Sequence, residues 1–519
     1  MNEKPKILAR TSGSFGLLNG KERCKANKLE AARTGLTFDD VLLVPKYSTI
    51  RSRKDASTKT RLTEKIELNI PILSANMDTV TEANMAVAMA REGGIGIIHR
   101  FMSMEEEVAQ VTRVKRTESI FIESPYTLNE GATISDARGL IQQRKVSGIL
   151  IVDSTGKLRG IVTTKDLRFF DGPADAKVTS VMTKRSDLVV APKKTTIEEA
   201  REIMQKTKIE KLPIVDLKDN LVGLITAKDI LKRKEFPFSS KDSKGRLRVG
   251  AAIGVKGDYL ERAEKLRDVE VDVLVLDIAH GHSLHALDAI RRIKKDLGRE
   301  VPLIAGNVAT SQGALDLIKA GADSIKVGVG SGSICITRIV TGSGVPQLTA
   351  ISDCSEAASD EGVTLIADGG IRNSGDITKA LVAGADSVMI GSLLAGTDES
   401  PGEIVYRGNY RYKVTRGMAS ASARKDQLEA ERMEKGVENP ENSEANEVGL
   451  IDYVPEGVEA IVPYKGGAVN VIRQLVGGLK SGLSYCGAGN LVQLRKNGEF
   501  MRITDVGLKE SLPHNVEGI

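Results

Sequence analysis

The sequence predicts an α/β fold, a (β/α)8 TIM barrel of eight parallel strands, interrupted by an inserted repeat. Six short apolar runs separated by stretches of helical periodicity follow residue 241, and two more precede residue 117. Polar residues or glycines stand where most of these runs end, which is where such a barrel carries its working residues. A doubly wound sheet is the alternative architecture. Eight runs split around a repeat favour the barrel.

The chain divides along these patterns. Residues 1–30 are basic and polar with little periodicity and are expected to form a loosely held arm. Residues 31–116 and 236–519 are expected to form the barrel, and residues 117–235 the insertion. The eight runs lie at 70–77, 93–100, 248–254, 271–277, 301–307, 324–328, 363–368 and 387–391.

Composition excludes several classes of protein. The net charge of +5 is a small excess, and no dense Lys/Arg face alternates with aromatic residues, so no nucleic-acid partner is expected. No apolar run reaches 18 residues and no secretory signal is recognisable, so no membrane partner is expected. The four cysteines are far apart and lack CxxC spacing, which predicts neither a zinc site nor a disulfide framework and favours a cytoplasmic location.

An internal repeat fills the insertion. The segment that begins at Ile151 can be laid over the segment that begins at Ile214, an offset of 63 residues. Each copy ends with a strand, the pattern T-x-x-D and a helix. The pair, about 117–176 and 178–235, resembles a tandem CBS (Bateman) module, and the resemblance implies adenine or guanine nucleotides bound by Thr163, Asp166, Thr226 and Asp229. The alternative is that both aspartates only cap helices.

A glycine-rich loop follows the run at 324–328. Glycine occupies every second position from 328 to 332, which lets the backbone take positive φ angles and approach a ligand closely. Backbone N–H groups and the Ser333 hydroxyl are suited to an anion, and carbonyls turned the other way to a cation. Cys335 follows, with the Thr337 hydroxyl two residues further on. A mobile loop with an inert thiol is the simpler alternative.

Four motifs together carry a resemblance over residues 28–516. They are the loop of the form GxGxGSxCxTR, Ser74-Ala-Asn-Met-Asp-Thr-Val80, Asp368-Gly-Gly370 and Tyr464-Lys-Gly466. The chain resembles the inosine-5′-monophosphate (IMP) dehydrogenase family, whose close relatives are the guanosine-5′-monophosphate (GMP) reductases. The resemblance implies NAD-dependent oxidation of IMP to xanthosine 5′-monophosphate, through a covalent purine adduct on Cys335 that water then hydrolyses. An NADPH-dependent reductase that deaminates GMP to IMP and a catalytically silent nucleotide sensor are the alternatives.

The resemblance also implies roles for individual residues. A thiolate is well suited to attack the purine C2, and Asp368 is suited to accept ribose hydroxyl protons. The expected catalytic residues are Cys335, Thr337 and Glu456. The expected substrate-binding residues are Ser333, Asp368, Gly369, Gly370, Gly391, Ser392, Met418 and Glu456, and the expected NAD-binding residues are Asp277, Asn307, Gly328 and Gly330. A K+ site is expected at Gly330, Gly332 and Cys335, completed by Glu510, Ser511 and Leu512 of a neighbouring subunit, which implies a homotetramer.

Two departures from the family pattern concern the segment after the last barrel run. Residues 418–453 are polar and aperiodic apart from a short helix expected near Lys425, which predicts a mobile flap. Many family members carry an adjacent Arg-Tyr pair there, and this flap has none. Thr415 also stands where the family often has a tyrosine. Proton transfer through Thr337 to Glu456 is then the remaining route, and the reductase stays an open alternative.

Overall fold

The computed structural model describes residues 32–117, 121–228, 230, 235–434 and 454–513, without the side chains of 429–434. The predicted N-terminal arm, residues 1–30, lies outside the described residues. Within them, no helix is both long and apolar enough to cross a membrane.

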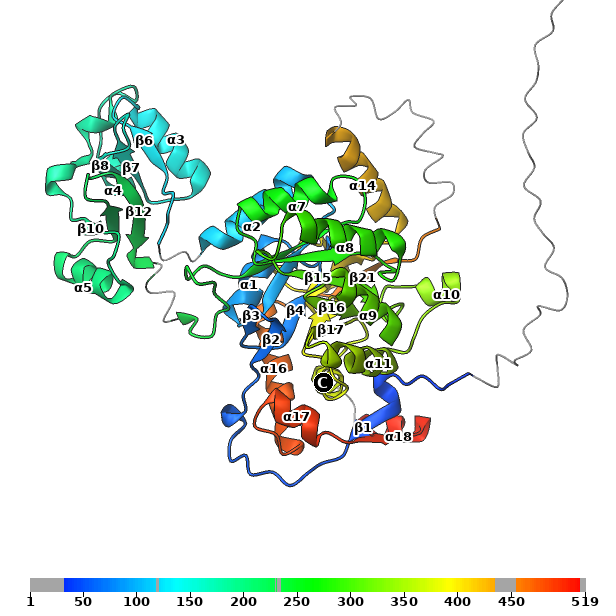
Figure 1. Ribbon diagram of the computed structural model, residues 1–519. Coiled ribbons are helices and arrows are strands. Elements are labelled where there is room, and N and C mark those ends of the chain that lie inside the picture. The colour runs from blue at the N-terminus through cyan, green and yellow to red at the C-terminus, as the bar shows by residue number, and fades with distance from the viewer. Residues whose placement is uncertain (1–31, 118–120, 229, 231–234, 435–453, 514–519) are drawn as a thin grey trace, which may run out of the picture. The chain divides into compact units, whose positions relative to one another are not determined.

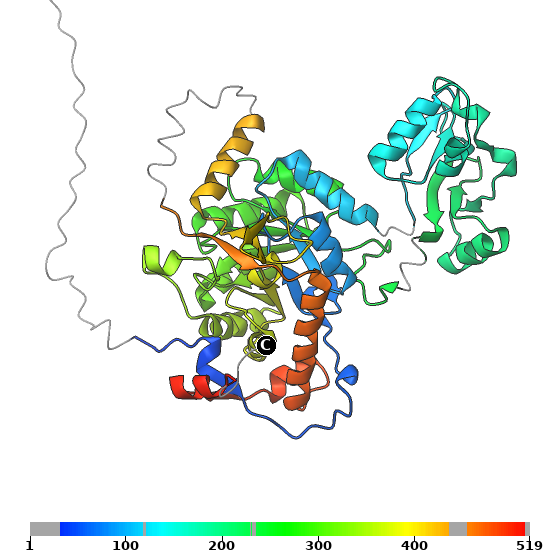
Figure 2. The same cartoon turned by 180° about the vertical axis from the view of Figure 1, so that it is seen from behind.

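Eight parallel strands close into a barrel, as the sequence predicts (Figures 1 and 2). The two strands that precede the insertion pair side by side and close the barrel with the six that follow it. In barrel order the strands are β13 (Val249–Ile253), β14 (Val273–Asp277), β15 (Leu303–Val308), β16 (Ser324–Val327), β17 (Thr364–Asp368), β18 (Ser387–Ile390), β4 (Ile72–Ser74) and β5 (Ile95–Ile98).

Alternation along the strands fills the barrel and covers it. On β14, Val273 and Val275 belong to a cluster inside the barrel, whereas Leu274 and Leu276 belong to the larger cluster between strands and helices. Both faces are therefore apolar, which is why the strands read as continuous apolar runs. The hairpin of β2 (Thr60–Thr63) and β3 (Ile66–Leu68) adds Leu62, Ile66 and Leu68 to the interior cluster.

The barrel helices form because each presents one apolar face to the strands. On α8 (Leu284–Asp296), Ala286, Ala289, Ile290 and Ile293 recur at spacings of three and four residues and are buried. The other helices that follow barrel strands are α1 (Ala83–Arg91), α2 (Met104–Thr117), α7 (Tyr259–Asp268), α9 (Ser311–Ala320), α10 (Thr337–Thr341), α11 (Gln347–Asp360), α12 (Ser374–Val382) and α13 (Ser392–Ala395). The C-terminal part adds α16 (Ala468–Tyr485), α17 (Leu491–Asn497) and α18 (Asp505–Glu510), and β22 (Phe500–Arg502) pairs with β1 (Val41–Leu43).

A three-stranded antiparallel sheet follows α13. Its strands are β19 (Ile404–Arg407), β20 (Tyr410–Arg416) and β21 (Glu459–Pro463). Between β20 and β21, α14 (Ala421–Glu434) begins at Ala421 rather than near Lys425, so the flap starts with a longer helix than the sequence predicts. Residues 435–453 of the flap lie outside the described residues.

The insertion contains two copies of one unit. Strands β7 (Gly148–Val152) and β8 (Leu158–Thr163) recur 63 residues later as β11 (Lys211–Val215) and β12 (Leu221–Thr226). Leu150 and Leu158 of the first copy share an apolar cluster with Val215 and Leu224 of the second. The remaining elements are β6 (Thr127–Asn129), α3 (Ile134–Arg144), α4 (Thr164–Arg168), β9 (Thr183–Lys184), β10 (Ala191–Pro192) and α5 (Ile197–Thr207).

The T-x-x-D pattern forms a helix cap in the first copy. The Thr163 backbone N–H and hydroxyl both donate to the Asp166 carboxylate, at 2.8 and 2.7 Å, and the Asp166 N–H donates back to the Thr163 hydroxyl. Thr226 ends β12 in the same way, and Asp229 lies outside the described residues. The capping interpretation therefore accounts for the first copy in the unliganded chain, and nucleotide binding stays a prediction.

Candidate functional site

The glycine-rich loop begins where β16 and β17 come closest. Gly328 has a φ of +150°, and a Cβ on it would lie 1.9 Å from the carbonyl oxygen of Asp368. Only glycine fits this approach. Further along the loop, the Arg338 guanidinium donates to the carbonyls of Val329 (3.3 Å) and Val345 (2.5 Å). These two hydrogen bonds connect the start of the loop to the segment that follows it.

Replacing Gly328 with alanine is expected to lower the free energy of unfolding by about 3 kcal/mol or more, because the new methyl group overlaps a backbone carbonyl. The matched control is Gly342→Ala. Gly342 also has a positive φ, +70°, but nothing lies within 4 Å of its missing Cβ. In the control, the free energy of unfolding should fall by only about 1–2 kcal/mol, which is the cost of a residue with a Cβ in the left-handed conformation. Denaturant unfolding measures both, and equal losses would contradict the steric argument.

Cys335, Thr337 and Glu456 form a connected chain of polar groups. The Thr337 hydroxyl donates to Glu456 Oε2 at 2.7 Å, and the Cys335 sulfur lies 3.1 Å from the same hydroxyl oxygen. Because the hydroxyl proton points to the carboxylate, the thiol is the donor in the second contact. The structure thus brings together the three predicted catalytic residues, although Glu456 is 119 positions from Thr337.

Backbone hydrogen bonds hold Glu456 in place. Its carbonyl accepts from the Ile336 N–H at 2.8 Å, and its N–H donates to the Ala419 carbonyl at 3.0 Å. Two residues later, the Val458 N–H donates to the Ile334 carbonyl at 3.0 Å. The segment after the flap therefore lies like a strand along the cysteine loop.

A buried lysine that the sequence reasoning missed connects two predicted ligand-binding carboxylates. Lys326, on β16, donates to Asp277 Oδ1 at 2.9 Å and to Asp368 Oδ2 at 2.8 Å, and it also contacts Asn307 Oδ1. Asn307 Nδ2 in turn donates to Asp368 at 2.9 Å and to the Gly328 carbonyl at 2.8 Å. The only sequence signal is a lysine inside an apolar strand run.

Charge pairing within this cluster outweighs burial. Burial alone would raise the pKa of Asp277, but the Lys326 ammonium leaves that pKa below its ordinary value. Burial alone would lower the pKa of Lys326, but Asp277 and Asp368 hold it above its ordinary value. Lys326 is therefore a fixed cation and is unsuited to act as a general base.

A cavity of about 510 Å³ opens beside Asp277 and is rich in basic side chains. Arg262 is neutralised by ion pairs to Glu107 and Asp258, at 2.7 Å each. The remaining basic side chains of the lining are Arg100, Lys256 and Arg424, the last from α14. A cavity of this charge suits an anionic ligand.

The other predicted substrate-binding residues lie at the ends of the neighbouring strands. Gly369 and Gly370 follow β17 with φ angles of +93° and +80°. Gly391 and Ser392 follow β18, and Ser333 is exposed in the glycine-rich loop. Met418 accepts a long 3.4 Å contact from the Asp78 N–H through its sulfur.

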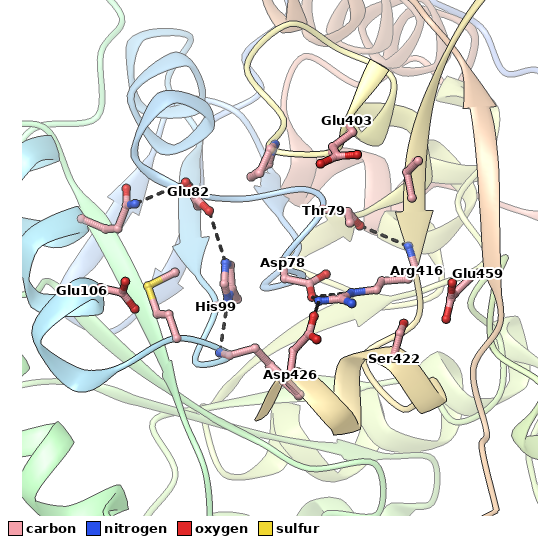
Figure 3. Close-up of a pocket in the computed structure, with 16 residues that line it drawn as sticks. Asp78, Thr79, Glu82, His99, Glu106, Glu403, Arg416, Ser422, Asp426 and Glu459 are labelled. Carbon is pink, nitrogen blue, oxygen red and sulfur yellow. Dashed lines mark hydrogen bonds and ion pairs between the residues drawn. The ribbon is translucent and has the colours of Figure 1, made fainter. Parts of the chain in front are cut away.

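Arg416 ties the flap helix to the barrel. It pairs with Asp78 Oδ2 at 2.5 Å and with Asp426 of α14 at 2.6 Å (Figure 3). Burial would lower the pKa of Arg416, but these two carboxylates hold it above its ordinary value. A second cavity, of about 510 Å³, is lined by Asp78, Arg416 and Asp426 and also by Glu82 and His99. No motif or spacing in the sequence predicts this connection.

Two sets of residues lie apart from the cysteine chain. Cys354 and Cys486 are buried and unpaired, and burial raises the pKa of the Cys354 thiol to about 12. Both are therefore packing residues. Glu510 ends α18, which packs beside the short helix Phe38–Asp40, and Ser511 and Leu512 follow it. Their predicted part in a cation site of a neighbouring subunit stays a prediction. Within the described residues no group of three or more His, Cys, Asp or Glu side chains is placed to hold a metal ion.

The chain is similar to known proteins over most of its length. The model of the IMP dehydrogenase / GMP reductase domain matches residues 35–514. The chain belongs to the IMP dehydrogenase / GMP reductase family. Among its relatives are an inosine-5′-monophosphate dehydrogenase of Nitrosopumilus maritimus, 53% identical over 93% of this chain and 99% of that one. Another, of Halalkalibacterium halodurans, is 52% identical over 93% of this chain and 96% of that one.

A solved structure of the same family is also similar. GMP reductase from Trypanosoma brucei in complex with guanosine 5′-monophosphate superposes with a TM-score of 0.87. The two are 44% identical, over 95% of this chain and all of that one. Membership of the IMP dehydrogenase / GMP reductase family thus accounts for the closed barrel.

Proposed function

We propose that this chain is an IMP dehydrogenase, which oxidises inosine 5′-monophosphate to xanthosine 5′-monophosphate with NAD in guanine nucleotide biosynthesis. Two curated relatives of that name, more than 50% identical and aligned over nearly their whole length, support the activity. The observation that carries the mechanism is the chain Cys335–Thr337–Glu456, with contacts of 3.1 and 2.7 Å. It joins a nucleophile to a hydroxyl and a carboxylate that can take a proton.

The proposed reaction has two stages. The Cys335 sulfur bonds to the purine C2 as the thiol proton moves to the neighbouring ring nitrogen, and C2 then gives up a hydride with its bonding electron pair. NAD, when bound, would supply the acceptor for that hydride. Water then adds to C2, and one of its protons passes through the Thr337 hydroxyl to Glu456; the C–S bond breaks as the other proton returns to the sulfur, which releases the product and the thiol. Thr337 can relay because its hydroxyl already donates to Glu456 Oε2.

The binding roles belong to the same proposal. Asp368 accepts the substrate ribose hydroxyl protons, and Ser333, the Gly369–Gly370 turn and the Gly391–Ser392 turn surround the phosphate, with Met418 beside them. Asp277 and Asn307 face the dinucleotide, with Gly328 and Gly330 at the near edge of the loop. The basic cavity beside Asp277 fits an anionic dinucleotide and supports this orientation.

The reductase is the second candidate, for two reasons. The flap lacks the adjacent Arg-Tyr pair that the dehydrogenase family often carries. The chain also superposes closely on a GMP reductase. The same cysteine would then add to the purine C2 of GMP, and NADPH would deliver a hydride after ammonia leaves.

A direct assay decides between the two candidates. IMP and NAD are mixed with the protein and the absorbance of reduced dinucleotide is followed; the proposal expects it to rise. In the second arm, GMP and NADPH are mixed with the protein, and the proposal expects no decrease. A decrease in the second arm without a rise in the first would overturn the dehydrogenase assignment.

A potassium ion and a homotetramer complete the proposal. Backbone carbonyls are the donors that K+ prefers, and Gly330, Gly332 and Cys335 supply three of them within one short stretch of the glycine-rich loop. The Gly332 carbonyl accepts the Cys335 N–H at 3.2 Å, and a carbonyl oxygen has a second lone pair that an ion can use. Glu510, Ser511 and Leu512 of a neighbouring subunit would supply the rest. The ion would hold the loop that carries the nucleophile.

The repeat is proposed to be the CBS pair, with adenine or guanine nucleotides bound at Thr163, Asp166, Thr226 and Asp229. The two copies share secondary structure at a constant offset and pack through a common cluster, which supports a paired module. A cytoplasmic location is part of the same proposal, and the unpaired cysteines support it.

A further inference from the structure

Lys326 lies where the proposed substrate and dinucleotide sites meet. Its side chain is only 3% exposed, yet it contacts side chains from three other strands, β14, β15 and β17. The carboxylates that it joins, Asp277 and Asp368, are those assigned above to the dinucleotide and to the substrate ribose. Their contacting oxygens lie no further apart than the sum of the 2.9 and 2.8 Å contacts to the shared ammonium.

We propose that Lys326 is a positioning residue that couples the two ligand sites, because its ammonium contacts both carboxylates and holds them at a fixed separation. The inference rests on the proposed function for the identity of the two ligands. Each ionised carboxylate can then accept ribose hydroxyl hydrogen bonds from its own ligand. Without the cation, two like charges face each other in a buried site, which disfavours having both ionised.

Asp277 and Asp368 also have other polar neighbours. Asn307, on β15, contributes an amide that donates to Asp368. Arg100, after β5, acts on Asp277 at longer range, and Asn76, after β4, hydrogen bonds to it. Among the residues that the structure describes, Lys326 is the one cation that contacts both carboxylates.

The chain contains a matched control. Lys115, on α2, is also buried and also joins two aspartates, Asp242 at 3.0 Å and Asp272 at 2.6 Å. Asp272 precedes β14 and Asp277 ends it, so the two lysines stand at opposite ends of one strand. Replacing Lys115 therefore removes the same kind of ion pair away from the proposed ligand sites.

The test compares Lys326→Met and Lys115→Met in the full-length protein. Isothermal titration measures IMP binding from pH 6 to 8 without dinucleotide, so no turnover takes place; steady-state rates then give KM for NAD. Lys326→Met is expected to bind IMP at least tenfold more weakly at pH 7 and to raise KM for NAD. Its IMP affinity should rise as the pH rises, by up to tenfold per pH unit, because without the cation one carboxylate holds a proton that must leave before it can accept the ribose hydroxyl hydrogen bonds.

Lys326→Arg keeps a cation and should show the pH dependence of the unmodified protein. Lys115→Met should lose thermal stability while IMP affinity and its pH dependence stay unchanged. Native IMP affinity in Lys326→Met, or the same new pH dependence in Lys115→Met, would overturn the proposal. Should the protein prove to be a reductase, GMP replaces IMP in the titration, so failure of the functional assignment and failure of the coupling are distinguishable.

A double variant keeps the test decisive if Lys326→Met folds poorly. Asp277→Asn combined with Lys326→Met leaves one carboxylate and no cation. Because the repulsion is then absent, the double variant should have a higher Tm than Lys326→Met alone and should bind IMP without the new pH dependence. A lower Tm would show that repulsion between the carboxylates is not what Lys326 relieves.

Discussion

Cys335→Ala is expected to lower kcat by about 10⁴-fold or more, because no covalent adduct can form and C2 then has no activated hydride to give. IMP binding should persist, since the residues that hold ribose and phosphate are unchanged. Stopped-flow absorbance of the reduced dinucleotide measures the loss. In the protein that keeps Cys335, mass spectrometry after an acid quench should find a purine adduct on the peptide that contains this cysteine.

Cys354→Ala is the matched control. This thiol is fully buried on α11, and burial raises its pKa to about 12, so it is inert as a nucleophile. The variant should lose some stability through the small cavity that it leaves, with kcat unchanged. Turnover by Cys335→Ala at a rate near that of the unmodified protein would remove the basis of the proposed mechanism.

The barrel was predictable because each strand is buried on both faces. Such a strand reads as a continuous apolar run whatever its neighbours are, and the predicted runs overlap all eight strands. The glycine-rich loop was predictable for a related reason: a loop that must approach β17 closely needs glycine at 328. The roles of Cys335 and Thr337 within it came from the family resemblance.

Contacts between distant segments were harder to predict. Lys326 contacts Asp277, Asn307 and Asp368, which come from three other strands. Nothing in the apolar run that contains Lys326 predicts these partners. The ion pair between Arg416 and Asp78 was hard to predict for the same reason, because the two residues are far apart in the sequence. Asp426, the second partner of Arg416, is nearer in the sequence. α14 starts earlier than predicted because its first residues, Ala-Ser-Ala, have no apolar periodicity to mark a helix.

Glu456→Gln is expected to slow hydrolysis of the adduct by about 10²–10⁴-fold, because glutamine cannot take the proton that Thr337 passes on. Hydride transfer should change little, since it precedes the entry of water. The Thr337 hydroxyl still finds an amide oxygen at the same position, so the geometry around Cys335 is kept. A burst of reduced dinucleotide, followed by slow turnover and by adduct that accumulates on Cys335, is the signature.

Glu459→Gln serves as its control, because Glu459 lies on β21, three residues from Glu456, and lines the second cavity rather than the cysteine chain. It should leave both stages unchanged. If Glu456→Gln slows the burst and the turnover equally, Glu456 acts before the adduct breaks down, and water must lose its proton to another group. Only a carboxylate that serves hydrolysis alone separates the two rates, which is why the comparison tests the Thr337–Glu456 relay rather than the general integrity of the loop.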